Sequence, residues 1–264
     1  MTCCDALEWD NQENQMKFCC PNCGREEEIL LDRNPRCRFC FIEMIAESDY
    51  SELWMSPYIA VRRMATVSET FGIERARKDG RFKKEREAWT TGVFALALTK
   101  LNGEQWWIEI ETEESTPDTK LRQLDQSTGN NVIQTRNIEV VDWEENVDDI
   151  MDVIRKKCRR AYPHHYLLLV NARNSGKVLD FDRVIQEMKG IHSPFLEVWV
   201  VAMVERDDMR VVRVAPGALS VDLEIRPELE KAKKQAPFIQ RGIRGTGTEV
   251  RDLGPAYLPI PRGD

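Results

Sequence analysis

The chain has 264 residues, of which 42% are hydrophobic, so it can bury a substantial core and is not disordered over most of its length. Its longest apolar runs, residues 92–98 and 198–204, fall far short of the roughly 18 residues that a membrane-spanning helix requires. The N-terminus carries no signal-peptide pattern, so the sequence predicts a cytoplasmic protein with no membrane partner.

The net charge of -7 is unevenly distributed. Residues 62–90 hold nine bases and five acids, whereas residues 104–149 hold thirteen acids and three bases. A protein that only coats nucleic acid would be basic throughout, because its affinity for phosphate comes from Lys and Arg. Three histidines leave little room for a Ser-His-Asp or multi-histidine site, so carboxylates and lysines are predicted to carry any chemistry.

The first predicted element is a zinc site, because seven of the eight cysteines lie within the first 40 residues. Two Cys-x2-Cys pairs, Cys20 with Cys23 and Cys37 with Cys40, have the spacing of a four-thiolate structural Zn2+ site. Cys19 is an alternative to Cys20 as the first ligand. Such a site has no open coordination position and is not predicted to be catalytic. The segment resembles the zinc-ribbon family, which predicts a ribbon over residues 1–45 that binds nucleic acid or another protein subunit.

The rest of the chain alternates between helical and strand patterns. Residues 57–89 read as helical, with a break at Asp79-Gly80. Strands are predicted at 93–99 and 106–112, joined by a hairpin at Asn102-Gly103, and a third strand is predicted at 138–143. The remaining predicted elements are a helix at 146–162, a buried strand at 166–172, a helix at 180–189 and a hairpin of strands 196–204 and 210–214. Residues 226–264 are predicted to be a basic, Gly/Pro-rich tail.

This order of elements resembles the restriction-endonuclease-like, or PD-(D/E)xK, nuclease superfamily over residues 57–214. The predicted fold class is therefore α/β: a mixed central sheet with an αβββαβ-type core over residues 46–225, plus the small β zinc ribbon. The resemblance implies cleavage of nucleic-acid phosphodiesters with Mg2+ or Mn2+. The superfamily holds the ion with an acid on the second strand and the acid of an Asp/Glu-x-Lys motif on the third, often helped by a Glu on the first helix.

The candidate site residues follow from matching that pattern to this sequence. The second predicted strand offers Glu109 or Glu111, and the third offers Glu139 in Glu139-Val140-Val141, which lacks the lysine of the motif.

Residues elsewhere could complete the site. A displaced lysine, Lys156 or Lys157, could replace the missing one, and Glu85 or Glu87 would be the helix acid. Pro117-Asp118 echoes the superfamily's name but falls in a stretch predicted to be polar loop.

Three functional hypotheses remain open at this stage. The first is a metal-dependent endonuclease acting on DNA, which would suit a prokaryotic defence or restriction system. The second is a catalytically inactive nuclease-like subunit that binds DNA or assembles with a protein, with the zinc ribbon as a structural element. The third is an unrelated α/β domain that binds a protein or a small molecule.

Overall fold

The computed structural model describes residues 15–19, 26–30, 45–46, 53–110, 117–125, 132–144, 147–163, 165–173, 177–205, 207–235 and 239–241. The helices are α1 Pro57–Phe71, α2 Ile73–Lys78, the 3-10 helix η2 Gly80–Phe82, α3 Lys83–Asn102, α4 Ile150–Cys158, α5 Phe181–Met188 and α6 Ile225–Gln235. The strands are β1 Gln15–Cys19, β2 Glu26–Leu30, β3 Ile45–Ala46, β4 Leu53–Met55, β5 Trp106–Ile110, β6 Thr119–Asp125, β7 Val132–Trp143, β8 Tyr166–Ala172, β9 Glu197–Glu205, β10 Asp208–Ala215, β11 Leu219–Glu224 and β12 Ile239–Arg241.

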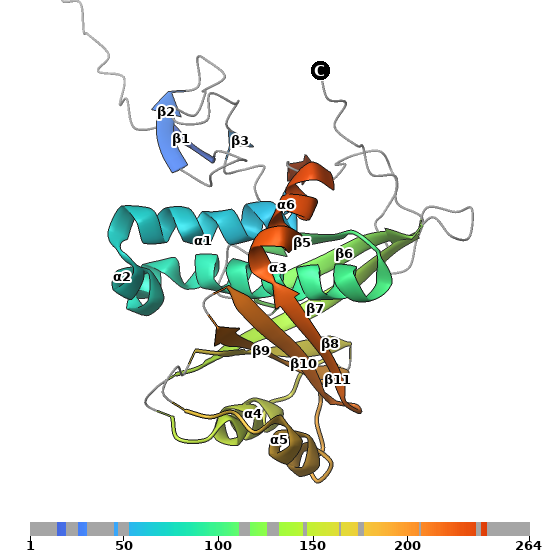
Figure 1. Ribbon diagram of the computed structural model, residues 1–264. Helices are drawn as coiled ribbons and strands as arrows, with labels where there is room; N and C mark the ends of the chain where they lie inside the picture. The colour runs from blue at the N-terminus through green and yellow to red at the C-terminus, as the bar shows by residue number, and fades with distance from the viewer. Residues whose placement is uncertain are drawn as a thin grey trace, which may run out of the picture.

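The protein is α/β with a mixed central sheet. Among the described residues this sheet has nine strands in the order β11-β10-β9-β8-β7-β6-β5-β4-β12. The strands β7, β8 and β9 run parallel, and the remaining neighbours are antiparallel. Helices α1, α3 and α6 cover one face, and α4 and α5 cover the other (Figure 1). None of the described helices combines the length and the apolar character that crossing a bilayer needs.

Strand β8 shows why both faces of the sheet are covered. Its alternate residues Leu167 and Leu169 belong to the core beneath α1 and α3, whereas Leu168 and Val170 belong to the core beneath α4 and α5. Because successive side chains of a strand point to opposite faces, a strand between two helical layers is apolar throughout. The predicted buried strand at 166–172 is therefore confirmed.

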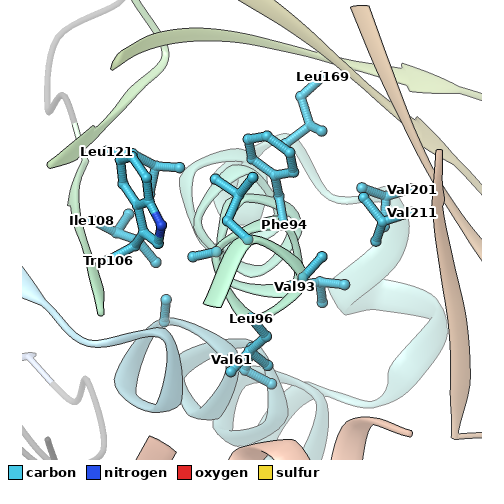
Figure 2. Packing of buried hydrophobic residues seen from close by; sticks show 14 of the residues in the cluster. Val61, Val93, Phe94, Leu96, Trp106, Ile108, Leu121, Leu169, Val201 and Val211 are labelled. Atoms are coloured by element: carbon cyan, nitrogen blue, oxygen red, sulfur yellow. The ribbon is translucent and has the colours of Figure 1, made fainter. Parts of the chain in front are cut away.

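The prediction of a strand at 93–99 is wrong, because these residues lie in the C-terminal half of α3. Periodicity cannot separate a short apolar run in a strand from one in a helix that is buried on all sides. Helix α3 is such a helix: Phe94 packs toward the sheet and Leu96 toward α1 (Figure 2), and all residues from Val93 to Leu98 are buried. Gly103 ends α3 in the left-handed conformation at φ 75°, so Asn102-Gly103 is a helix terminus and not a hairpin turn.

Helices α1 and α3 pack closely at Gly92. A Cβ atom at this position would lie 3.0 Å from Val61 Cγ2 and 3.2 Å from Ala60 Cβ. The absence of a side chain at Gly92 therefore lets α1 lie directly on α3, and Figure 2 shows Val61 of α1 against Leu96 of α3.

Strand β6 was not predicted, since residues 113–131 are mostly polar. In the structure β6 pairs with β5 on one side and with β7 on the other. The predicted third strand at 138–143 lies inside the longer β7, and the later helices and hairpin occur at α4, α5, β9 and β10. With 93–99 helical and β6 added, the order from α3 onward is helix, three antiparallel strands, helix, strand.

The ends of the chain contain further elements. Strands β2, β1 and β3 form a separate antiparallel sheet. The predicted zinc ligands Cys20, Cys23, Cys37 and Cys40 lie outside the described residues. Within the segment predicted as a tail, α6 packs against α1 and α3, and β12 pairs with β4.

Candidate active site

A cavity of about 410 Å3 opens where α3 begins, beside the start of β6, the second half of β7 and the end of α4. Its walls are rich in both signs of charge. They are formed by Lys83, Arg86, Glu87, Asp118, Glu139, Val140, Val141, Asp142, Lys157 and Arg160.

Three of the cavity's carboxylates are buried: Glu87 and Glu139 are each 4% exposed and Asp118 is 8% exposed. Asp118 stands one residue before Thr119, whose partner on β7 is Ile138, so Asp118 lies opposite Glu139 across the strand pair. The Val140 backbone N–H donates to Asp118 Oδ2 at 2.9 Å, which fixes this carboxylate against β7. Glu87 reaches the same cavity from α3.

Glu139 is held by groups that follow β7 in the sequence. The Lys157 ammonium of α4 donates to Glu139 Oε1, and the Tyr162 hydroxyl donates to the same oxygen at 3.1 Å. Burial raises the pKa of Tyr162, so the phenol remains a donor at neutral pH. Because both donors bind one oxygen, the carboxylate is oriented while its Oε2 is left without a hydrogen-bond partner.

Glu87 has a different environment. Lys83 Nζ lies 3.3 Å from Glu87 Oε1 and Lys84 Nζ lies 3.1 Å from Glu87 Oε2, but neither contact has hydrogen-bond geometry. Burial raises the pKa of the Glu87 carboxyl, and the negative charge of Asp118 raises it further, while Lys84 and Lys83 lower it. The raised pKa means that the ionised form of Glu87 is only partly compensated here.

A divalent cation would suit these carboxylates, because hard cations bind carboxylate oxygens. Both oxygens of Glu87 and Oε2 of Glu139 are buried and accept no hydrogen bond, so the site holds carboxylate oxygens whose hydrogen-bonding capacity the protein does not fully satisfy. In the part of the chain that the structure describes, however, no three His, Cys, Asp or Glu side chains form a group that could hold a metal ion. The unpartnered oxygens fit a cation, but the present arrangement is not a complete metal site.

The rim of the cavity is tied to α2 and η2 by arginines. Arg173 Nη1 donates to Asp142 Oδ2 at 2.6 Å, and its Nη2 donates to the Arg77 carbonyl oxygen. Arg86 Nη1 donates to the carbonyl oxygens of Ala76 and Asp79 at 3.1 and 2.8 Å. Burial lowers the pKa of Arg86, and nearby Asp142 opposes this shift. These contacts hold the α2 segment at the mouth of the cavity.

The structure brings together some of the predicted site residues and not others. Glu139 lines the cavity, but Glu85 pairs with Arg63 at 3.3 Å and Glu109 pairs with Lys120 at 3.6 Å, both outside it. Lys156 is exposed on α4, and Glu111 lies outside the described residues. The alternatives weighed from the sequence, Glu87, Asp118 and Lys157, are the residues that join Glu139 in the cavity.

Asp142, Arg86 and Tyr162 were not singled out from the sequence. The sequence does offer a signal for Asp142, because this residue follows Glu139 by three positions and lies near the carboxyl end of the same strand. Tyr162 carries no such signal, because its contact with Glu139 depends on how α4 folds back over β7. Comparison of the chain with protein-family models, curated proteins and solved structures finds no match.

Proposed function

We propose that this chain is a divalent-metal-dependent endonuclease that cuts DNA at the cavity lined by Glu87, Asp118, Glu139 and Lys157. The observation that carries the proposal is the convergence of three buried carboxylates and a lysine from four separate elements, α3, the start of β6, β7 and α4. Such a cluster costs stability, because buried charges are expensive unless they are fully paired. A functional requirement explains why it is present.

The order of elements around this cavity supports the same conclusion. From α3 to β8 the chain runs helix, three antiparallel strands, helix, strand, which is the order that the PD-(D/E)xK resemblance implies. Within it, Pro117-Asp118 directly precedes the second strand, Glu139-Val140-Val141 lies on the third and Glu87 lies on the helix. Lys157 then takes the place of the lysine that the third strand lacks, because its ammonium reaches Glu139 from α4.

Each residue has a specific role in the proposed reaction. Asp118, Glu139 and Glu87 would have to move closer together to hold Mg2+ or Mn2+, because in the described residues they do not form a group that could hold a metal ion. When bound, the ion would supply charge neutralisation at the phosphate and acidification of water. Lys157 orients the Glu139 carboxylate and lies where it can donate to an attacking water. Arg86, Lys83 and Arg160, which line the same cavity, can contact the phosphate oxygens.

A second candidate is an inactive nuclease-like subunit that binds DNA without cutting it. Two observations favour it. Val141 occupies the position of the motif lysine on β7, and Lys84 and Lys157 already neutralise Glu87 and Glu139, where a cation would have to compete with them. In this second candidate the charged cluster has no catalytic role, and the basic side chains around it hold the DNA.

The test is cleavage of labelled plasmid and linear DNA with Mg2+ or Mn2+, with EDTA as the metal-free control. The variants are Asp118→Asn, Glu139→Gln and Lys157→Met, with Glu109→Gln as the matched control for a carboxylate outside the cavity. Metal-dependent cutting that is lost in the cavity variants and kept in Glu109→Gln supports the endonuclease. Absence of cutting by the wild type, with DNA binding retained, would support the inactive subunit.

For the N-terminal segment we propose a structural zinc ribbon with Cys20, Cys23, Cys37 and Cys40 as ligands. Four thiolates in two Cys-x2-Cys pairs support it. Elemental analysis of the purified protein should give about one zinc per chain. A Cys23→Ser variant should lose this zinc, and an unchanged zinc content would contradict the assignment.

A further inference from the structure

The connection between α1 and α3 carries apolar and basic side chains that the rest of the fold does not cover. Phe71 is 46% exposed and Ile73 is 66% exposed, so two large apolar side chains that are two residues apart in the chain both face solvent. Arg75, Lys78 and Arg81 stand exposed beside them. We name the set Phe71, Ile73, Arg75, Lys78, Arg81 and Phe82 the α2 patch. Figure 1 shows α2 at the end of the α1–α3 layer that lies away from α6.

Rings and guanidinium groups alternate in the α2 patch. The Phe71 and Phe82 ring centroids are 5.0 Å apart, with the ring planes inclined by 35°. The Arg75 guanidinium lies 5.8 Å from the Phe71 centroid, and the Arg81 guanidinium lies 5.7 Å from the Phe82 centroid. Proteins that bind single-stranded nucleic acid combine these two features, because bases stack on aromatic faces while cations contact the phosphates.

The charge of this segment suits a polyanion. Residues 73–87 contain seven basic and four acidic side chains, a net charge of +3 in a chain whose total is -7. Glu74 pairs with Lys78 at 3.1 Å and Asp79 pairs with Arg81 at 2.6 Å, and these exposed pairs hold the cations in place at the surface. Glu74 and Lys78 are both well exposed, so their pair contributes little stability and a phosphate can replace Glu74 at low cost. Arg75 and Arg81 both pair with Asp79, and Arg81 does so through several hydrogen bonds, so these two guanidinium groups stay anchored to Asp79 while a phosphate binds.

The α2 patch is physically continuous with the cavity. Lys83 follows Phe82 directly and lines the cavity wall, and Arg86, another wall residue, donates to the Asp79 carbonyl oxygen at 2.8 Å. A strand bound across η2 therefore lies next, along the chain, to Lys83 of the cavity wall.

We infer that the α2 patch binds a single-stranded segment of nucleic acid that leads into the cavity. An unpaired base stacks on Phe71, and Arg75, Lys78 and Arg81 contact the phosphates on either side. Exposed Phe71 and Ile73 favour unpaired bases over an intact duplex, because a duplex keeps its base faces stacked and offers them no partner. The entry of the strand into the cavity rests on the proposed endonuclease function, whereas the binding itself does not.

The test is fluorescence anisotropy with a fluorescein-labelled 20-nucleotide oligo-dT and a 20-base-pair duplex, in EDTA so that no cutting occurs. Phe71→Leu removes the ring and keeps an apolar side chain, so it should weaken binding of the single strand about tenfold and of the duplex less than about twofold. Near-wild-type thermal unfolding of this variant checks that the fold is kept.

A charge variant gives an independent measurement that does not depend on Phe71 packing. Arg75→Gln combined with Lys78→Gln should weaken binding of the single strand and lower the slope of log affinity against log salt by about 1.4, which is about 0.7 for each lost phosphate contact. The matched control is Lys231→Gln with Lys234→Gln on the exposed side of α6, which should leave both quantities unchanged.

Failure of the inference about the α2 patch and failure of the proposed endonuclease function give different results. Patch variants that bind both probes like the wild type, or that match the α6 control, overturn the inference and leave Phe71 and Ile73 as a surface for a protein partner. Patch-dependent binding of the single strand without any metal-dependent cutting by the wild type would support the inference while refuting the endonuclease. Cutting that is lost in Asp118→Asn, together with patch variants that bind like the wild type, would support the endonuclease and refute the inference about the α2 patch.

Discussion

Two groups of carboxylates in this protein look equivalent in the sequence and are different in the structure. Glu109 lies on β5 and faces Lys120 of β6 at 3.6 Å, as an acid and a base opposite each other on one sheet face do. Glu87, Asp118 and Glu139 come from three elements and converge in one cavity. Glu109 is neutralised by Lys120 on the adjacent strand. In the cavity, Glu87 and Glu139 retain buried oxygens that accept no hydrogen bond.

The difference teaches that buried carboxylate oxygens without hydrogen-bond partners, rather than the density of acids, distinguish a candidate site. A sheet surface can place an acid opposite a lysine with no further requirement. To hold three carboxylates in a cavity, the protein must recruit a backbone N–H for Asp118, a lysine and a phenol for Glu139, and two lysines for Glu87. That cost is consistent with a ligand that completes the neutralisation.

The largest expected effect is on DNA cleavage. Asp118→Asn keeps the size of the side chain and removes its charge, so it should lower metal-dependent cutting at least about 100-fold, because one metal-binding carboxylate is lost. Glu109→Gln should stay within about threefold of the wild type, because Glu109 and its partner Lys120 lie outside the cavity. Initial rates of plasmid nicking at saturating Mg2+ measure both. Equal losses in the two variants would remove the distinction between the two groups.

The next effect is on stability and concerns the Glu139–Lys157 pair. Lys157 is 17% exposed and Glu139 is buried, so Lys157→Met leaves a carboxylate without its cation and should lower the free energy of unfolding by about 3 kcal/mol. Lys156→Met on the exposed side of the same helix should change it by less than about 0.5 kcal/mol. Urea unfolding of the two variants makes the comparison. Similar midpoints would show that Lys157 is effectively solvated.

Cation binding itself should be visible as a thermal shift. If Mg2+ binds the cavity carboxylates, a concentration ten times the dissociation constant stabilises the folded chain by about 1.4 kcal/mol and raises Tm by about 3 °C. The shift should disappear in Asp118→Asn and persist in Glu109→Gln. A Tm that rises equally in both variants would assign the cation to another part of the molecule.

The sequence allowed the fold to be predicted where one signal dominated. The apolar run of β8 was correctly predicted as a buried strand, and the periodic residues of α4 as an amphipathic helix. The error at 93–99 arose because α3 is enclosed by α1 and the sheet, which removes the periodicity that marks a surface helix. That one error shifted the strand count, so the second-strand acid was sought at Glu109 and Glu111 and not at Asp118.

The site was predictable only in part, for a related reason. Glu139 could be chosen because an acid in an otherwise apolar strand stands out. The choices between Glu85 and Glu87, and between Lys156 and Lys157, depend on the rotation of α3 and α4 about their axes, which tertiary packing sets. Residues one apart on a helix, such as Lys156 and Lys157, point about 100° apart, and residues two apart, such as Glu85 and Glu87, point about 160° apart. One residue of each pair therefore faces the cavity and the other faces Arg63 or solvent.

The smallest expected effect is a pH dependence of the free energy of unfolding that comes from Glu87 and not from Glu109. The folded-state pKa of Glu87 is raised above its ordinary value of 4.5 by burial and by Asp118, so the folded chain binds this proton more tightly than the unfolded chain. Stability from this group is therefore greatest below pH 4.5 and declines as pH rises through the raised pKa. Glu87→Gln cannot ionise, so its stability relative to the wild type should increase over the same interval. Lys83 and Lys84 offset part of the cost, which keeps the change small.

Urea unfolding between pH 4 and pH 8 measures this change in stability, with Glu109→Gln as the control outside the cavity. A difference between Glu87→Gln and the wild type that is constant with pH would mean that Glu87 ionises as freely as a solvent-exposed carboxyl, and the contrast between the two groups of carboxylates would then rest on Glu139 and Asp118 alone.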